Sequence, residues 1–380
     1  MLLNCRGTVL ALTADSNLYS WNDVYDMVFP RLVRSSVAAV KSCSSSGTYV
    51  IQTQDHRFIV GIYEGPDLEI TTTVYNALGK DEECLGMDVC SNSIVIWSAY
   101  RICIINLRIT KDIVYRITGL SFAHHTFPHR INLVRCGFRC TVIRTDGGLI
   151  YSLGYHSSVG PRLVRVPNSL DVLDIVMAFF SLLITMDDAR PQICRMIYES
   201  NENNETEVLY ANTVTPIEFP LDVRIAKTVS ENGHNFFITT KGECYYSYTN
   251  NKVNTDPVLI KSLLGCMVTS IFVTVDGIII LHDANKLCLL KTEYWGITEP
   301  TAICVPQLDR DESIITVVCS CFGTYIITDW GRVYRSPDIR GPIMARIKFF
   351  DESPLEIETD VPMIKSSLSY AETASYYIND

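Results

Sequence analysis

A motif that recurs about every 46 residues restricts the fold of this chain more than any other feature. Each copy is an apolar stretch, a short polar turn and a second apolar stretch. Two copies are near twins: CSSSGTYVIQ (43–52) and CSCFGTYIIT (319–328) lie 276 residues, or six periods, apart. The clearest copies span 7–21, 47–61, 140–154, 234–248, 278–290 and 323–336, and weaker ones span 93–105 and 179–197. Such a repeat predicts a fold built from equivalent units.

The length and content of the repeat favour a β-propeller, in which each repeat forms one four-stranded sheet, or blade. Helical repeats of similar length would need long stretches with a 3.6-residue period, and these are almost absent. The turns Asp146-Gly147, Lys241-Gly242 and Trp330-Gly331 are expected to supply the positive φ of a tight hairpin. We therefore predict an all-β fold, a single closed β-propeller of seven or eight four-stranded blades.

The two ends of the chain are expected to complete the propeller. IKSSLSY (364–370) echoes VKSCSSS (40–46) at a distance of about seven periods. A propeller must not leave sheet edges open, so we expect the C-terminal strand to join the blade begun by the N-terminal hairpin. Residues 1–380 would then form one domain, with an inserted loop at about 199–220.

The 14 cysteines and two apolar runs have structural interpretations. Cys43, Cys90, Cys136 and Cys319 fall at matching places in the repeat, where a small buried side chain fits an inner strand. The start of the chain lacks the layout of a signal peptide and no CxxC pair occurs, so we expect an intracellular protein without a metal site. The runs 172–186 and 263–281 contain Asp174 and Asp276-Gly277, and we expect buried strands there instead of membrane spans.

The charge of the chain bears on its partners. Lys and Arg total 32 against 42 Asp and Glu, for a net charge of −10, and no run of basic residues exceeds two. Nucleic acids and anionic membranes are bound by clustered basic residues. We therefore expect neither as a partner.

The strongest copy of the repeat, LVRCGFRCTVIRTDGGLIYSLGYHSSVGP (133–161), resembles the regulator-of-chromosome-condensation repeat. Cys140 replaces the usual His of that repeat and Leu153 the usual Trp. A second good copy spans 317–334, and 228–247 keeps the His as His234. No Trp-Asp dipeptide closes a blade and Gly147-Gly148 is the sole Gly-Gly, so WD-repeat and kelch propellers rank lower. The residues in register with the family pattern are Val134, Cys136, Gly137, Thr141, Asp146, Gly147, Tyr151 and Gly154.

The resemblance implies a seven-bladed propeller that serves as an interaction platform. The founding member of the family exchanges guanine nucleotide on the small GTPase Ran and carries a basic tail that binds chromatin. Such a tail is absent here, so we do not expect chromatin docking. The copies are too divergent for exchange-factor residues to be assigned one by one.

Two segments carry the candidate partner-binding residues. The first is the acidic stretch 199–220, expected as a protruding loop that could engage a basic surface; its residues are Glu199, Glu202, Glu205 and Glu207. The second is HHTFPH, expected in a loop between strands; its residues are His124, His125 and His129. Loops on the faces of a propeller carry function, whereas its strands carry packing.

The sequence thus predicts a protein-interaction propeller without a cofactor or a catalytic constellation. In its most specific form it would be an exchange factor or regulator for a Ran-like small GTPase. The alternative is a non-catalytic structural or scaffold subunit of a larger assembly, and an enzymatic propeller ranks third. The expected partner is a protein, a small GTPase or subunits of a complex.

Overall fold

A computed structural model describes residues 1–5, 8–22, 30–43, 46–62, 65–80, 82–90, 92–111, 115–137, 140–154, 160–166, 171–177, 181–186, 190–200, 206–210, 214–231, 233–249, 255–274, 277–293, 296–303, 305, 308–320, 323–336 and 345–347. The chain divides into two compact units, one of residues 1–71, 111–116 and 269–380, and one of residues 72–110 and 117–268. Among the described residues, each unit contains four large antiparallel sheets, and the first unit also contains a two-stranded ribbon.

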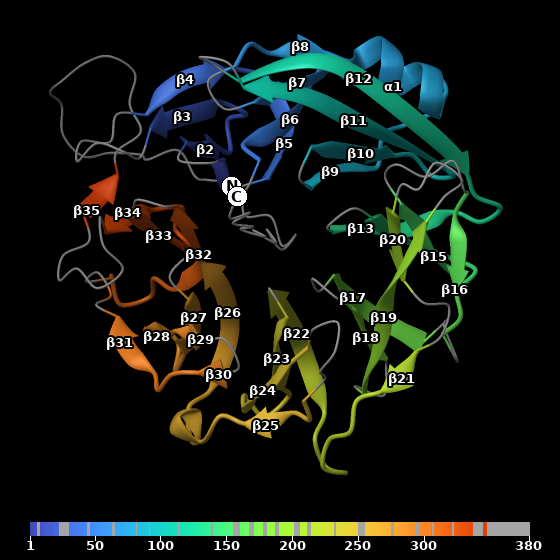
Figure 1. Cartoon of the computed structure of the whole chain (residues 1–380). Coiled ribbons are helices and arrows are strands. Elements are labelled where there is room, and N and C mark those ends of the chain that lie inside the picture. Colours follow the sequence, from blue (N-terminus) through green and yellow to red (C-terminus); the bar gives the residue numbers. More distant parts are fainter. Residues whose placement is uncertain are drawn as a thin grey trace, which may run out of the picture. The chain divides into compact units, whose positions relative to one another are not determined.

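The first unit holds the first two and the last two sheets of the chain (Figure 1). The first sheet is β1 (Leu2–Cys5), β2 (Thr8–Leu12), β3 (Leu18–Asn22) and β4 (Arg31–Arg34). The second is β5 (Val37–Cys43), β6 (Thr48–Thr53), β7 (Phe58–Ile62) and β8 (Leu68–Glu69). The seventh is β26 (Val268–Thr274), β27 (Gly277–His282), β28 (Lys286–Leu290) and β31 (Thr301–Ile303), with a small ribbon of β29 (Thr292–Glu293) and β30 (Gly296–Ile297). The eighth is β32 (Ile314–Ser320), β33 (Gly323–Thr328), β34 (Val333–Ser336) and β35 (Ala345–Ile347).

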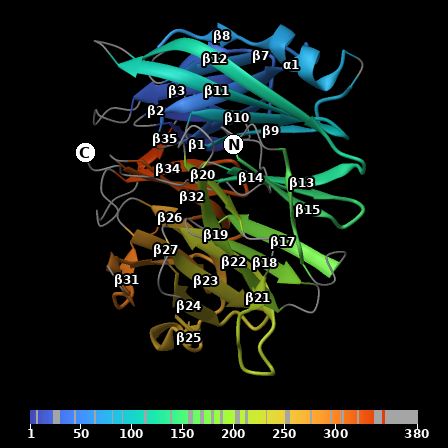
Figure 2. The ribbon, with the colours of Figure 1, turned by 45° about the vertical axis from the view of Figure 1, so that its right-hand side comes forward.

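The second unit holds the four middle sheets, and Figure 2 shows β17, β18 and β19 side by side. The third sheet is β9 (Gly86–Cys90), β10 (Ser93–Trp97), β11 (Arg101–Lys111) and β12 (Tyr115–Thr126). The fourth is β13 (Ile131–Gly137), β14 (Cys140–Thr145), β15 (Ile150–Gly154) and β16 (Arg162–Val164). The fifth is β17 (Val172–Met177), β18 (Ser181–Met186), β19 (Pro191–Ser200) and β20 (Thr206–Tyr210), with β21 (Thr215–Pro216) also paired to β19. The sixth is β22 (Ile225–Glu231), β23 (His234–Thr239), β24 (Cys244–Tyr248) and β25 (Val258–Leu259).

Two short helical segments complete the described structure: the helix α1 (Thr71–Leu78) and the 3-10 turn η2 (Lys261–Leu263). The start of α1 is tied to β7, because the Thr71 hydroxyl accepts a hydrogen bond from the backbone N–H of Phe58 at 3.0 Å. No helix in the described ranges has the length and apolar character to span a membrane.

Eight four-stranded sheets that follow one another along the chain are the blades of a β-propeller, so the predicted fold class is confirmed with eight blades. The second strand of each blade is covered on both faces, which explains its continuous apolar sequence. All six residues of β18 and all six of β23 are buried. The apolar runs 172–186 and 263–281 form such strands, as predicted. Residues 364–370 lie outside the described residues, and the four strands of the first blade all come from residues 2–34.

Neighbouring blades share apolar cores within each unit. In the first unit the seventh blade packs on the eighth, the eighth on the first and the first on the second. In the second unit the third, fourth, fifth and sixth blades pack in that order. Cys43, Cys90 and Cys136 are buried near the ends of the first strands of their blades, as their matching places in the repeat predict.

One detail of the predicted turns is wrong. Gly242 and Gly331 have positive φ (79° and 72°), but in the Asp146-Gly147-Gly148 turn the positive φ of 74° belongs to Gly148. The turn is longer than a two-residue hairpin, because the N–H of Thr145 bonds to the carbonyl of Leu149. The left-handed residue is therefore the second glycine of the turn, two positions before β15 begins.

Candidate functional site

The turns between the second and third strands are built alike in five blades. In each, a buried threonine begins the turn, and its N–H donates to the carbonyl of the residue four positions later, at 2.9 to 3.0 Å. The five threonines are Thr13, Thr53, Thr145, Thr239 and Thr328. The residues between these anchors differ in every blade. A common scaffold with variable, solvent-facing residues is the arrangement of a recognition surface.

The turn of the second blade borders an open polar pocket of about 520 Å³ in the first unit. One wall is the end of β4 and the link to β5, and the other is the turn between β6 and β7. The lining residues are Arg34, Ser35, Ser36, Thr53, Gln54, Asp55 and Arg57. These seven residues include no histidine or cysteine, so they supply charge and hydrogen bonds instead of a nucleophile with its base.

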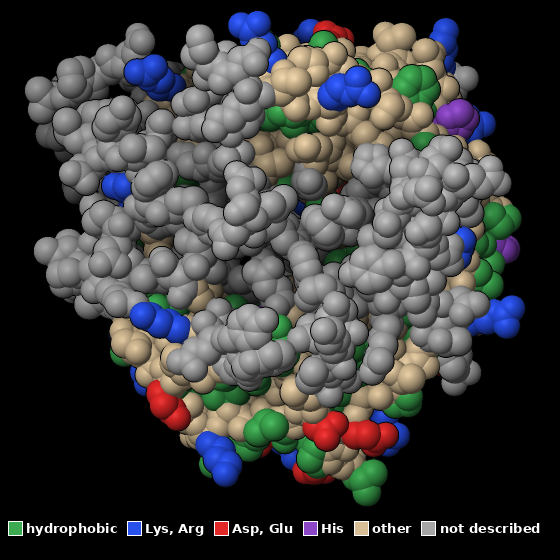
Figure 3. All heavy atoms as spheres, viewed as in Figure 1, with side chains coloured by type: hydrophobic (Ala, Val, Ile, Leu, Met, Phe, Trp, Pro, Cys, Tyr) green, Lys and Arg blue, Asp and Glu red, His purple; other side chains and the backbone are tan. Residues whose placement is uncertain are grey.

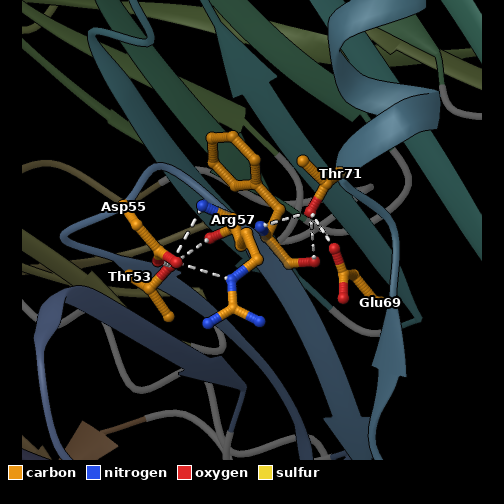
Figure 4. Close-up of polar contacts among 6 residues, drawn as sticks. Thr53, Asp55, Arg57, Glu69 and Thr71 are labelled. Atoms are coloured by element: carbon orange, nitrogen blue, oxygen red, sulfur yellow. Dashed lines mark hydrogen bonds and ion pairs between the residues drawn. The ribbon is translucent and has the colours of Figure 1, made fainter.

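Arg57 is held in place by a chain of hydrogen bonds, drawn in Figure 4. Its Nε donates to a carboxylate oxygen of Asp55 at 2.8 Å, and the Thr53 hydroxyl donates to the other oxygen. The hydrogen bond from Thr53, followed by those from Arg57, holds the pKa of Asp55 below its usual value. The outer Nη groups of the guanidinium point away from this carboxylate. Asp55 therefore orients Arg57 and leaves its outer edge open.

The opposite wall is fixed less firmly. The Arg34 Nη2 lies 3.6 Å from Asp67, which is an ion pair without a good hydrogen bond. The Nε of Arg34 is buried and has no acceptor among the described residues. The backbone is better defined: the Gln54 N–H donates to the Ser36 carbonyl at 2.8 Å, and the Gln54 side chain donates to the Ser16 hydroxyl at 2.9 Å.

The equivalent turn of the eighth blade presents an aromatic side chain. Trp330 is 43% exposed, and the guanidinium of Arg332 lies over its ring at 4.8 Å. Arg332 donates to Asp309 and, at 2.9 Å, to Glu312, whose side chain is fully buried. The hydrogen bond to Asp309 is the main cause of a raised pKa for Arg332. Trp and Arg held in this way are typical of interaction hot spots.

The predicted histidines do not all lie in a loop. His124 and His125 belong to the outer strand β12, and His129 follows in the turn before β13. His124 and His129 are exposed and His125 is half-buried. Burial, followed by the proximity of His124, lowers the pKa of His125. The interpretation of HHTFPH as an inter-strand loop is thus wrong for two of its three histidines, because the edge strand is longer than the repeat indicates.

The acidic stretch 199–220 contains strands. Glu199 lies near the end of β19 and Glu207 in β20, and the two residues are paired in register. Glu202 and Glu205 lie outside the described residues. β19 first pairs with β18 through residues 191–195 and then with β20 through residues 196–200, so it continues past the blade as one arm of a hairpin.

The sequence did not indicate that Arg34, Arg57 or Trp330 belongs to a candidate site. A signal was available, because the twin phrases both continue into a turn that contains an aspartate and closes on an arginine: Asp55 with Arg57, and Asp329 with Arg332. The contribution of Arg34 could not be found in this way, since it comes from the preceding blade. Figure 3 shows Lys and Arg side chains dispersed over the described part of one face.

These eight blades, five of which share the threonine-anchored turn, define the protein by its fold as a β-propeller. No family model matches the chain, and no curated protein matches its sequence. Solved structures do match. Prp20p from Saccharomyces cerevisiae, described with its binding to Gsp1p and histones, aligns with 82% of this chain and 91% of its own, at 9% identity and a TM-score of 0.52.

Human WBSCR16 aligns with 77% of this chain and 86% of its own, at 10% identity and a TM-score of 0.50. The dihydro-heme d1 dehydrogenase NirN aligns with 90% of this chain and 72% of its own, at 10% identity and a TM-score of 0.51. At such identities the likeness shows the fold alone. The β-propeller fold that the repeat resemblance implies is confirmed, with eight blades where the resemblance implies seven.

Proposed function

We propose that this protein is a protein-binding β-propeller that contacts partners through its second-to-third-strand turns and, at the other end of a third strand, through the hairpin of β19 and β20. The observation that carries this proposal is the set of turns that share a buried threonine anchor and differ in their exposed residues. In the first unit, such turns offer Arg57 beside a pocket in the second blade and Trp330 in the eighth. Surfaces of this kind bind proteins through a few anchored side chains.

In its most specific form, we propose exchange of guanine nucleotide on a Ran-like small GTPase. Two observations support it: the repeat resembles that of the regulator of chromosome condensation, and Prp20p, whose structure was described with its binding to Gsp1p, shares the fold. The hairpin of β19 and β20 with its glutamates would contact a basic surface of the GTPase. His124 and His129, exposed on and after β12, form a second candidate contact.

A scaffold role is the second candidate, and exposed apolar side chains favour it. Phe122 is 60% and Leu120 37% exposed on β12, which is the outer strand of its blade. A long outer strand offers unpaired backbone groups, which partner chains can use for pairing. A neighbouring subunit would cover these side chains.

Release of a fluorescent guanine nucleotide from Ran-type and other small GTPases tests the exchange proposal. The wild-type chain is expected to accelerate release, and a variant with residues 199–207 replaced by a short Gly-Ser turn is expected to lose that acceleration. Substituting Glu199, Glu202, Glu205 and Glu207 by Gln should weaken it, whereas the control E83Q/E299Q, at exposed sites outside residues 199–220, should not. His124→Ala and His129→Ala are assayed in the same way.

Folded wild-type protein that accelerates no GTPase would overturn the exchange proposal and leave the scaffold. The two are further separated by size-exclusion chromatography of the protein isolated from its source. A scaffold should elute with stable partners, and L120S/F122S should release them. Migration as a monomer would count against the scaffold.

A further inference from the structure

The pocket between Arg34 and Arg57 has the donors and the shape for an acidic group. We propose that it binds the carboxylate of an acidic, partly apolar segment of a partner protein. This inference rests on the proposed role in protein binding and specifies the chemistry of one contact. It does not depend on exchange activity.

Arg57 provides the first half of the site. Its Nε is occupied by Asp55, and its Nη groups make no hydrogen bond to a described residue. The side chain is 48% exposed, yet its position is fixed by the bonds through Asp55 to Thr53. A guanidinium fixed at one edge loses little rotamer freedom when its open edge forms a bidentate pair with a carboxylate.

Arg34 and two serines provide the second half. The ion pair of Arg34 with Asp67 is long, at 3.6 Å, and its Nε is buried without an acceptor in the described chain. A buried donor without a partner costs free energy, so the guanidinium gains by turning toward an incoming oxygen. Ser35 and Ser36 line the same pocket, and their hydroxyls form no side-chain hydrogen bond with any described residue. The site thus offers several donors to one ligand.

The pocket is lined by the carboxylate of Asp55, and the carboxylate of Asp67 lies beside Arg34. Both carboxylates already have hydrogen-bond or ion-pair partners among the described residues. Both oxygens of Asp55 accept hydrogen bonds, one from Thr53 and one from Arg57. Asp67 accepts a hydrogen bond from the Tyr49 hydroxyl and pairs with Arg34. These carboxylates position the guanidiniums, and the unused hydrogen-bonding capacity of the pocket is on the donor side.

The rim indicates that the ligand belongs to a peptide with apolar residues. Leu32 and Val33 precede Arg34 on β4, and each is 43% exposed. Leu68, which follows Asp67 on β8, is 37% exposed. The Arg34–Asp67 pair brings these two outer strands together. An acidic residue in the pocket would therefore place its neighbours over apolar side chains.

Fluorescence anisotropy with a fluorescein-labelled peptide of alternating glutamate and leucine tests the proposal. The wild-type chain is expected to bind it, with an affinity that falls as salt is raised. R57Q should weaken binding by about five-fold to thirty-fold, as expected for loss of a charge-assisted contact. R34Q should also weaken it, and R310Q, at an exposed arginine outside the pocket, should bind like wild type. Circular dichroism establishes that each variant is folded.

Four results would overturn the proposal. The first is no binding by wild type at low salt, and the second is equal binding by R57Q and R310Q. The third is equal binding of a peptide with glutamine in place of glutamate. Displacement by inorganic phosphate as effective as by unlabelled peptide would show a general anion site and would also reject the peptide. The peptide-binding assay contains no GTPase, so a negative result in it does not change the conclusion drawn from the nucleotide-release assay.

Discussion

The indole N–H of Trp21 donates a hydrogen bond to the hydroxyl of Tyr325 at 3.2 Å, across 304 residues of sequence. Both side chains are buried, and they belong to the first and eighth blades. Their rings are 5.9 Å apart and tilted by 60° within the core shared by those blades. The first and last blades of the chain are thus joined by a specific polar contact inside an apolar interface.

Removal of that hydroxyl should destabilise the protein. Tyr325→Phe leaves the buried indole N–H without its acceptor, which costs about 1–3 kcal/mol. Urea denaturation followed by tryptophan fluorescence measures the change. Tyr49→Phe, which removes a more exposed hydrogen bond to Asp67, should cost less and serves as the control. Equal stability of Tyr325→Phe and wild type would show that the bond contributes nothing.

The buried carboxylate of Glu312 should contribute more to the stability of the folded protein than the exposed carboxylate of Asp309, although both pair with Arg332. Glu312 is 2% exposed and also accepts a hydrogen bond from Thr328 at 2.6 Å. Breaking a buried pair costs about 3–5 kcal/mol, whereas an exposed pair contributes about 0–1 kcal/mol. We expect Glu312→Ala to lower the thermal midpoint strongly and Asp309→Ala only slightly. The reverse order in calorimetry would refute this interpretation.

Acidification should reduce stability through His234. Burial lowers its pKa from 6.5 to about 4, and its Nδ1 lies 2.9 Å from the Tyr246 hydroxyl. Between these two values the unfolded chain binds a proton that the folded chain does not. The contribution of the neutral, buried His234 to the free energy of unfolding is therefore complete above about pH 6.5. It is lost as the pH falls toward 4, and the loss amounts to about 3 kcal/mol.

His234→Gln removes this titration, so its stability difference from wild type should shrink as the pH is lowered from 7 to about 4.5. Urea midpoints at several pH values measure it. The exposed His124→Gln should parallel wild type. A difference for His234→Gln that is constant with pH would contradict the assignment.

Thiol reactivity should follow burial. Burial raises the pKa of Cys103 and of Cys194 to about 12, and both side chains are inaccessible. Because the thiolate is the reactive form, both should resist iodoacetamide at pH 8 in the folded protein. Cys266, which is half-buried, is the internal comparison and should be alkylated first. Mass spectrometry with and without urea locates the label, and rapid native labelling of Cys194 would contradict the prediction.

The sequence was sufficient to predict the blades, because each repeat contains its own strands, turn and core residues. The twin phrases alone correctly locate β6 and β33 and their turns. The number of blades was left open, since weaker copies such as 93–105 lack the turn chemistry of the others. The long strands β11, β12 and β19 were not predicted, because they extend beyond the repeat length.

The candidate pocket could not be predicted, for a physical reason. Arg34 and Arg57 belong to consecutive blades, and their approach depends on how β4 ends and how the turn after β6 folds. Two residues in the pocket region, Ser36 and His56, have left-handed φ values of 58° and 62°. Neither residue type requires this conformation, so the pattern of the sequence does not indicate it.

The division of the first unit between the two ends of the chain has a consequence during synthesis. The first blade leaves the ribosome early, yet the face that contains Val9 and Trp21 packs on residues of the eighth blade. At about 5–20 residues per second, the 304 residues from Trp21 to Tyr325 take roughly 15 to 60 seconds to translate. During that time the apolar face of the first blade is not yet covered by the eighth blade. A nascent chain of this kind needs protection by chaperones, and a truncated product lacking the last blade is a natural substrate for degradation.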